Sequence, residues 1–316
     1  MLNSKGNQIV NMIIPGTSFN GELPPLTEAE FGVSDRLKAD VIVLAESIGI
    51  RNTENPEALE LASDFIKSTF TGLGYIVKRE CYFIEGLEVT NVIAEVQGAE
   101  KPHEILVIGA HYDSAHGTPG ADDNASGVAV LLELAHRFND YKPRCTIRFV
   151  AFVNEEPPYF QTDLMGSLVH ARGCRQHNEK IIGMLCLESL GYFSTAIGSQ
   201  LYPPPLNRFY PNTADFIAFC GNITSYPLLR RCIKQFRITT KFPSEGLVAP
   251  ESFASIGFSD HWAFWQTGYQ AVMITNTAFL RNPHYHLPSD IPAHLDFDRM
   301  TRVAEGLKQL VAYLSS

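Results

Sequence analysis

Ligand-type side chains are concentrated around one apolar run and the turn that follows it. Residues 105–108 form the apolar run and lead directly to His111 and Asp113. A glycine-rich turn then brings Asp122 and Asp123 just ahead of a segment with helical periodicity. Imidazole and carboxylate groups are the ligands that hydrolytic metal sites use. This stretch therefore predicts a metal site.

Further ligand-type residues follow other predicted strands. They are Glu155 and Glu156 after residues 146–153, Glu188 after residues 182–187, and His286 beyond residues 271–275. In an open α/β sheet, the carboxyl ends of the strands border the crevice where ligands bind. We therefore expect these side chains to converge on one site.

Each of these groups has a simpler explanation when it is taken alone. Adjacent glutamates are commonly a solvated loop, a single histidine a satisfied polar residue, and an Asp-Asp pair a turn with a helix cap. Glu188 is harder to explain in this way, because it directly ends an apolar strand where an unpaired carboxylate is costly. Taken together, the residues favour a metal cluster.

The mixture of donor groups indicates the kind of metal centre. Imidazole and carboxylate ligands without a thiolate suit zinc or a similar divalent ion at a catalytic site, with cobalt or manganese as alternatives. Two histidines and three carboxylates are sufficient for two ions about 3.5–4 Å apart that share one bridging carboxylate. We therefore expect two Zn²⁺ ions.

Alternating strands and helices must position these residues. Apolar periodicity predicts helices over residues 35–48, 56–73, 128–138, 165–174 and 297–314, and strands over residues 75–79, 88–96, 105–109, 146–153, 182–187 and 271–275. Such alternation predicts an α/β fold with three layers, α/β/α, around a mostly parallel, mixed central sheet.

Two segments fall outside this alternation. Residues 1–34 have the composition of an irregular N-terminal arm, and residues 35–316 are expected to form a single catalytic domain. Within that domain, residues 192–258 carry a Pro-Pro-Pro run and many aromatic residues, which favours an addition to the sheet. Two interpretations of the aromatic residues stay open, a wall of a substrate pocket and a separate core cluster.

Composition and charge argue against several partners. The 316 residues include 34 acidic and 25 basic side chains, a net charge of −9, so we expect no nucleic-acid binding. The sequence has no apolar run that could span a bilayer and no signal-peptide pattern, so we expect a cytoplasmic protein without a membrane partner, unless a leader was trimmed. The six cysteines contain no Cys-x-x-Cys pair and are expected to be buried thiols. Oligomeric state is not readable from these features.

Six motifs resemble one peptidase family. They are His111-Tyr112-Asp113-Ser114, the run from Gly120 to Gly127, Asn154-Glu155-Glu156-Pro157, Met165-Gly166-Ser167, Ser259-Asp260-His261, and Tyr285-His286 with Asp290. In type and order they resemble the dizinc aminopeptidases of metallopeptidase family twenty-eight, relatives of the glutaminyl cyclases within the zinc-dependent exopeptidases. The resemblance extends over residues 35–316.

The resemblance implies a role for each candidate ligand. His111 and Glu188 would bind one zinc ion, Glu156 and His286 the other, and Asp123 would bridge the two. The expected bridging residue is therefore Asp123 rather than its neighbour Asp122.

Further roles follow from the same resemblance. Glu155 matches the general base, and the Asp113 carboxylate would accept the ring N–H of His111 that faces away from the metal. The Asp123-Asn124 peptide bond would be cis. Hydrolysis would use a metal-activated water whose proton Glu155 accepts and passes to the leaving amine. The substrate would be a peptide with a free N-terminus, and the aromatic segment favours an apolar or aromatic first residue.

Two departures from the family pattern affect details. Glu188 stands where many simple aminopeptidases carry aspartate. Residues 255–258 lack the tyrosine that helps to bind the oxyanion in some members. Tyr285, another tyrosine or the metals alone are candidates for that role.

Other functions are compatible with parts of the pattern. A glutaminyl cyclase would share the fold and most ligands but would catalyse intramolecular acyl transfer at a single zinc. A non-catalytic binding protein of the same fold would have lost ligands, whereas this sequence keeps all of them. A serine hydrolase built on Ser126 or Ser259 is disfavoured, because neither serine lies in a Gly-x-Ser-x-Gly motif. A zinc aminopeptidase is our principal expectation, with the first two as alternatives.

Overall fold

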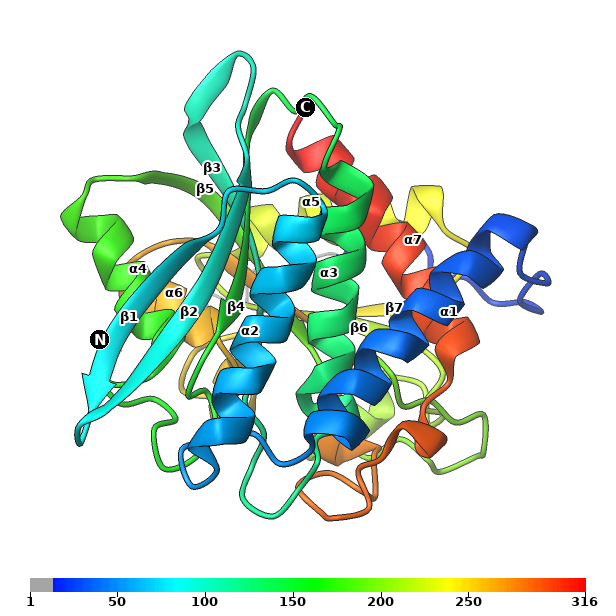
Figure 1. Cartoon of the computed structure of the whole chain (residues 1–316). Helices are drawn as coiled ribbons and strands as arrows, with labels where there is room; N and C mark the ends of the chain where they lie inside the picture. Colours follow the sequence, from blue (N-terminus) through cyan, green and yellow to red (C-terminus); the bar gives the residue numbers. More distant parts are fainter. Residues whose placement is uncertain (1–13) are drawn as a thin grey trace, which may run out of the picture.

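A mixed sheet of eight strands forms the centre of the computed structural model, which describes residues 14–316 (Figure 1). The strands lie in the spatial order β1-β2-β4-β3-β5-β8-β6-β7. Their bounds are β1 Lys78–Ile84, β2 Leu87–Val96, β3 Lys101–His111, β4 Cys145–Phe152, β5 Lys180–Glu188, β6 Ile217–Asn222, β7 Ser244–Ala249 and β8 Ala271–Thr275.

The four strands that lead to the predicted site are parallel neighbours. β3 pairs in parallel with β4 on one side and with β5 on the other, and β5 pairs in parallel with β8. β1 and β2 are antiparallel additions at one side, while β6 is antiparallel to β8 and parallel to β7. Because parallel strands end at the same edge, the predicted ligands that follow β3, β4, β5 and β8 meet there.

Seven α-helices of the described chain cover the two faces of the sheet. They are α1 Glu28–Ile42, α2 Pro56–Gly72, α3 Gly127–Phe138, α4 Gly166–Gln176, α5 Tyr226–Thr239, α6 His261–Gln266 and α7 Phe297–Leu314. α1, α2, α3, α5 and α7 pack on one face, and α4 and α6 on the other. Successive side chains of β3 point to opposite faces of the sheet. Leu106 and Ile108 therefore belong to the core under α1, α2, α3, α5 and α7, and Ile105 and Val107 to the core under α4 and α6. The α/β/α prediction with a mostly parallel, mixed sheet is confirmed.

The first helix begins earlier than residue 35. α1 starts at Glu28 because Thr27 and Glu30 form a capping box, in which the Glu30 N–H donates to the Thr27 hydroxyl and the Thr27 N–H donates to the Glu30 carboxylate. The irregular part of the arm therefore ends at Thr27, and residues 1–13 lie outside the described chain.

The structure of residues 192–258 differs most from the prediction, which was an addition outside the alternating strands and helices. Their middle part supplies β6, α5 and β7, so it belongs to the sheet and to one helical layer. The first edge strand also differs, since β1 occupies Lys78–Ile84 rather than residues 75–79. None of the described helices is both long and apolar enough to cross a membrane.

Candidate metal centre

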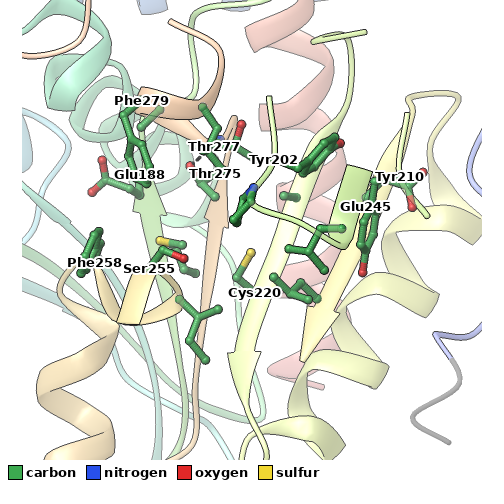
Figure 2. Close-up of a pocket in the computed structure, with 18 of the residues that line it drawn as sticks. Glu188, Tyr202, Tyr210, Cys220, Glu245, Ser255, Phe258, Thr275, Thr277 and Phe279 are labelled. Carbon is green, nitrogen blue, oxygen red and sulfur yellow. Dashed lines mark hydrogen bonds between the residues drawn. The ribbon is translucent and has the colours of Figure 1, made fainter. Parts of the chain in front are cut away.

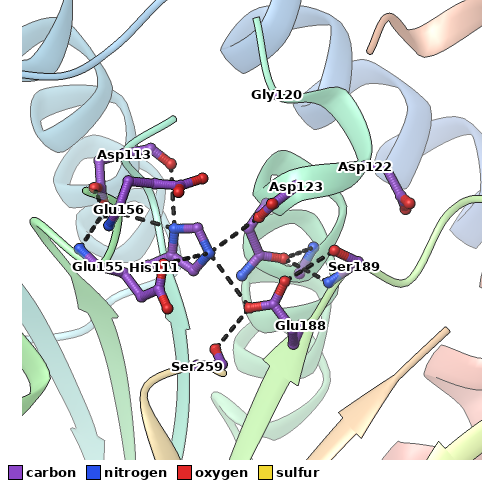
Figure 3. A network of polar contacts seen from close by, with 12 residues as sticks. His111, Asp113, Gly120, Asp122, Asp123, Glu155, Glu156, Glu188, Ser189 and Ser259 are labelled. Carbon is purple, nitrogen blue, oxygen red and sulfur yellow. Dashed lines mark hydrogen bonds and ion pairs between the residues drawn. The ribbon is translucent and has the colours of Figure 1, made fainter. Parts of the chain in front are cut away.

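His111 ends β3 and places its imidazole at the carboxyl edge of the sheet (Figure 3). Its Nε2 atom lies 3.2 Å from Oδ1 of Asp123 and 3.3 Å from Oε2 of Glu188. Its Nδ1 atom lies 3.2 Å from the backbone carbonyl oxygen of Asp113. Because a carbonyl oxygen can only accept, Nδ1 carries a proton, and Nε2 is the nitrogen that faces the cluster and can bind a cation in place of its own proton.

Asp113 faces the ring N–H of His111 and also supports the loop after β4. Its carboxylate Oδ1 lies 3.5 Å from His111 Nδ1, and its own backbone carbonyl oxygen lies 3.2 Å from the same nitrogen. The carboxylate also accepts the backbone N–H groups of Glu155 and Glu156, both at 3.1 Å. The role that the resemblance implies for Asp113 stays a prediction, and the structure adds that its carboxylate holds the start of the loop after β4.

Asp123 contacts both histidines of the cluster. Its Oδ1 lies 3.2 Å from His111 Nε2, and its Oδ2 lies 3.1 Å from His286 Nε2. The peptide bond Asp123-Asn124 is cis, as the resemblance implies. The carboxylate of Asp290 accepts the backbone N–H of Asp123 at 3.1 Å and holds the turn in place.

The two glutamates after β4 take different positions. Glu156 Oε2 lies 3.2 Å from His286 Nε2. Glu155 Oε2 lies 3.8 Å from His111 Nε2, farther than the carboxylates of Asp123 and Glu188. Glu155 is thus adjacent to the cluster, with a weaker contact to its imidazoles than the other carboxylates have.

Glu188 ends β5 and is held by two serine hydroxyls. Ser189 donates to its Oε1 at 2.8 Å, and Ser259 donates to its Oε2 at 2.6 Å. Ser259 lies in the Ser-Asp-His motif, for which the residue pattern alone indicates no contact. The structure explains this part of the motif, since the serine orients a buried carboxylate from the loop before α6.

His286 comes from the long loop after β8. Its side chain is 32% exposed, whereas those of His111, Asp123 and Glu188 are exposed by 8% or less. The Tyr285 ring stacks on the His286 imidazole with ring centroids 3.9 Å apart. The outer side of the cluster is therefore open to a ligand at His286.

Burial and mutual repulsion raise the pKa values of the glutamates. Burial is the largest cause for Glu155 and raises its pKa well above the ordinary value, with the negative charges of Glu156 and Glu188 adding to it and His111 opposing it. Burial and the charge of Asp123 raise the pKa of Glu156 to about 7. The pKa of Glu188 is raised for the same reason, burial first and Asp123 second.

Mutual contacts favour the charged forms of the two histidines and of the carboxylate between them. Burial would lower the pKa of His286, but its contacts with Asp123 and Glu156 outweigh that effect and raise it to about 10. The pKa of His111 is raised as well. The pKa of Asp123 is lowered, because the two histidines beside it outweigh the effect of its burial. At neutral pH the cluster thus holds protons that a bound cation would displace.

The donor atoms of the cluster fit a divalent metal. His111, Asp123 and Glu156 each offer one atom, and the three atoms lie within 4.8 Å of one another. His111 Nε2, Asp123 Oδ1 and Glu156 Oε1 are buried and have no hydrogen-bond partner within residues 14–316. Buried polar atoms without partners are costly, and mixed imidazole and carboxylate donors suit zinc.

Asp122 points away from the cluster and makes a separate network (Figure 3). Its carboxylate accepts the backbone N–H groups of Gly191 and Tyr192 and the side-chain amides of Asn276 and Asn282. These donors come from the loops that follow Glu188 and that precede His286. Asp122 therefore holds two ligand-bearing loops together.

Arg51 is a supporting residue that carries no signal in the sequence. It is fully buried and donates to the carbonyl oxygens of Tyr112, Pro119 and Gly120. These acceptors flank the loop between His111 and the Asp-Asp turn. An isolated arginine in an N-terminal segment gives no indication of such a role, because its acceptors are backbone atoms 61 to 69 residues away.

A pocket opens beside Glu188 and encloses about 810 Å³, including its open mouth (Figure 2). Its walls are mainly apolar and include Phe216, Ala218, Cys220, Leu247, Ile256 and Met273. Tyr202, Tyr210 and Phe216 of the aromatic segment line this pocket, whereas Phe193 and Phe219 belong to the core under the other helical layer. The aromatic residues therefore divide between a pocket wall and the large core under α1, α2, α3, α5 and α7, rather than forming a separate cluster, and the use of the pocket by a substrate stays a prediction.

Comparison with known proteins identifies the family. The model of peptidase family M28 matches residues 91–311, which contain every predicted ligand. The chain belongs to peptidase family M28. This confirms the resemblance and the prediction of a peptidase. Protein YfbL of Escherichia coli (strain K12) is 37% identical to this M28 chain over 286 residues, which are 88% of the chain and 87% of YfbL.

Other similar proteins carry names that describe an activity. Leucine aminopeptidase 1 of Trichophyton equinum is 28% identical over 239 residues, 71% of this chain and 58% of that protein. Among solved structures, the zinc aminopeptidase BSAP of Bacillus subtilis superposes with a TM-score of 0.71 at 15% identity, covering 89% of this chain and 95% of BSAP. The glutaminyl cyclase of Porphyromonas gingivalis superposes with a TM-score of 0.66 at 17% identity, covering 89% and 98%. At these identities the two structures support the fold alone.

Proposed function

We propose that this M28 peptidase is an aminopeptidase that uses two zinc ions to remove the first residue of a peptide. His111 and Glu188 would hold one ion, Glu156 and His286 the other, and Asp123 both. The contacts of Asp123 carry the proposal, because its two oxygens lie 3.2 Å and 3.1 Å from two different imidazoles. A carboxylate that faces two separate metal ligands in this way has the arrangement of a bridge between two ions.

Bound zinc would supply Lewis acidity and lower the pKa of a bound water from ~15.7 towards ~7. Glu155 is the proposed general base. It lies beside the cluster, and burial raises its pKa well above the ordinary range. A carboxylate with a raised pKa can accept the proton of the attacking water and return it to the leaving amine. Cobalt or manganese would suit the same donors.

Tyr285 is the best candidate for a hydrogen bond to the oxyanion. Three tyrosines line the pocket, and two of them are engaged in the fold, Tyr202 with the carbonyl of Pro211 and Tyr210 with that of Gly246. Within residues 14–316 the Tyr285 hydroxyl makes no hydrogen bond, and its ring lies on His286. A free donor beside a metal ligand can stabilise the charge that develops on the scissile carbonyl oxygen.

Replacing Tyr285 with phenylalanine tests this role. The change removes only the hydroxyl, so we expect kcat to fall about 10²-fold with little change in KM and no loss of zinc. Tyr202→Phe is the matched control, because its hydroxyl bonds to the fold and its activity should stay near that of the wild type. Equal activity of both variants would assign the oxyanion to the metals alone.

The pocket gives the proposed enzyme its N-terminal specificity. It begins at Glu188, so a peptide whose first carbonyl lies at the metals can place one side chain in it. Its apolar walls favour a bulky apolar or aromatic first residue, and the carboxylates of the cluster attract a free α-amine. Cleavage of a panel of aminoacyl anilides checks this preference, which fails if charged residues are cleaved best.

Glu155→Gln is the direct test of the proposed mechanism. The amide keeps the shape of the side chain but cannot accept a proton, so hydrolysis of leucyl-anilide should fall by about 10³-fold or more. Elemental analysis should still find two zinc ions per chain. Glu54→Gln, an exposed site paired only with His116, is the control and should remain active. Undiminished activity of Glu155→Gln would refute the assigned base.

A glutaminyl cyclase is the second candidate, because such an enzyme would share the fold and most of the ligands. The two candidates differ in products and in metal content. Turnover of leucyl-anilide and of a glutaminyl peptide, measured alongside the zinc count, separates them. One zinc per chain together with cyclisation alone would replace our proposal with this candidate.

A further inference from the structure

The segment around α5 is basic, although the whole chain is acidic. Residues 216–244 contain no Asp or Glu, while the complete chain has a net charge of −9. Five cations lie close together in this segment, namely Arg230, Arg231, Lys234, Arg237 and Lys241. Uncharged residues separate all of them except the adjacent Arg230 and Arg231, so they form no continuous charged run in the sequence.

Helical geometry collects these cations on one face of α5. At 100° per residue, Arg230, Arg231, Lys234 and Ile238 fall within an arc of about 100°. All four are exposed, whereas the opposite side of the helix, which includes Leu229, is buried against the sheet and α7. The solvent-facing side of α5 therefore carries basic, apolar and neutral polar residues but no acidic one. Lys241 continues it just beyond the end of the helix.

Acidic side chains make no direct ion pair with the exposed cations of this face, although Glu30 and Glu305 line the same surface pocket as Lys241. In the part of the chain that the structure describes, Arg230, Arg231, Lys234 and Lys241 form no ion pair. Arg237 differs, because it donates to backbone carbonyls of the N-terminal arm and lies 3.7 Å from Glu245. Four positive charges thus remain free on the surface, and Arg237 is not one of them.

Exposed apolar side chains flank the four charges. Ile238 is 66% exposed and Ile223, just before α5, is 48% exposed. Tyr313 of the adjacent α7 is 42% exposed, and its ring lies 5.7 Å from the guanidinium carbon of Arg231. Cations interspersed with exposed isoleucine and tyrosine are the composition of surfaces that lie on lipid headgroups.

We propose that this α5 face, formed by Arg230, Arg231, Lys234, Ile238 and Lys241, docks the protein on a membrane surface rich in anionic lipid. The charges are complementary to such a surface. The shape favours a bilayer over an acidic peptide, because the face is the convex side of a helix and a peptide ligand needs a groove. The docking is peripheral and reversible, and it is independent of the proposed peptidase chemistry.

Vesicle sedimentation of the full chain tests the docking. Wild-type protein should bind vesicles of phosphatidylglycerol and phosphatidylcholine but not vesicles of phosphatidylcholine alone. Binding should weaken as salt rises, because ions screen surface charges beyond about 10 Å at 0.1 M. Each cation near an anionic surface strengthens binding about fivefold, so the quadruple variant R230Q/R231Q/K234Q/K241Q should bind several hundredfold more weakly, about 600-fold.

A charge-matched control separates this face from net charge. The variant K38Q/K78Q/R79Q/K142Q removes four exposed cations elsewhere and should bind nearly as well as the wild type. Circular dichroism and peptide hydrolysis in solution verify that both variants are folded. Equal loss of binding in the two variants would overturn the proposal, as would a wild type that ignores anionic vesicles or binds neutral ones equally well.

Discussion

Asp122 and Asp123 are consecutive and buried, yet their carboxylates have opposite surroundings. Asp122 accepts hydrogen bonds from neutral amides, among them the backbone of Gly191 and the side chains of Asn276 and Asn282. Asp123 lies between His111 and His286, and its Oδ1 has no hydrogen-bond partner in the described chain. One carboxylate is satisfied by the fold, and the other is not.

The difference gives a criterion for separating support from ligand in this molecule. Neutral amide donors satisfy a buried carboxylate without changing its charge, so Asp122 can join loops permanently. Imidazoles that share protons with carboxylates leave lone pairs that a cation can take, so Asp123 is suited to exchange protons for metal. Adjacent residues of identical type thus take different functions because their partners differ.

The variant Asp123→Asn should remove the proposed metal-binding role of this carboxylate. The amide can offer only one oxygen and places an NH₂ group towards an imidazole, so we expect loss of the proposed bridge. The kcat/KM for leucyl-anilide should fall by about 10³-fold or more, and the rise in Tm that zinc produces in the wild type should disappear. Kinetics and thermal unfolding with and without zinc measure both effects. Retention of the zinc-induced rise in Tm would contradict the bridging role.

The sequence alone is sufficient to predict the edge of the sheet at which the ligands meet. The runs before His111, Glu155 and Glu188 are largely apolar, as buried parallel strands are, and a ligand-type residue stands at the end of each run or a few residues beyond it. The bounds of β8 and α7 agree with the prediction, since Ala271–Thr275 is a continuous apolar run and Phe297–Leu314 has apolar residues at helical spacing. Strand ends that carry polar groups therefore locate the candidate site without a structure.

Local sequence cannot decide whether Asp122 or Asp123 is the metal ligand. The amides that satisfy Asp122 come from residues 69 to 160 positions away, so only the resemblance to a family favours Asp123. The periodicity of α5 is present in Leu228, Leu229 and Ile233, but the prolines and aromatic residues around it suggest irregular structure. Long-range partners and mixed composition are the two causes of the missed features.

The variant Asp122→Asn should weaken the hydrogen-bond network through which this carboxylate joins two loops. An asparagine keeps one acceptor oxygen but brings an NH₂ group towards converging N–H donors, so buried donors lose their partner. We expect a loss of about 3 kcal/mol in the free energy of unfolding, measured with urea. The zinc-induced rise in Tm should persist, in contrast to Asp123→Asn. An unchanged unfolding midpoint would show that the joint between the two loops does not depend on the charge of Asp122.

A pH titration of zinc affinity is the smallest and most specific test of the difference. The pKa of His286 is raised to about 10 and that of Glu156 to about 7, so both groups bind protons at a higher pH than their ordinary values allow. Zinc must displace these protons, and its affinity should therefore fall as pH falls. Below a pH of about 10 His286 competes, which alone predicts a loss of zinc affinity of about tenfold per pH unit, and below about 7 Glu156 makes the loss steeper. The raised pKa values of His111 and Glu188 add to the loss in the same direction.

Competition with a chelator at fixed free zinc measures this slope. Asp122→Asn should keep the slope of the wild type, because its amide network exchanges no proton with a metal. An affinity that does not change between pH values of about 8 and 6 would mean that the protons of the cluster are not exchanged for zinc. In that case, the orphaned lone pairs of His111 and Asp123 would need another explanation than metal binding.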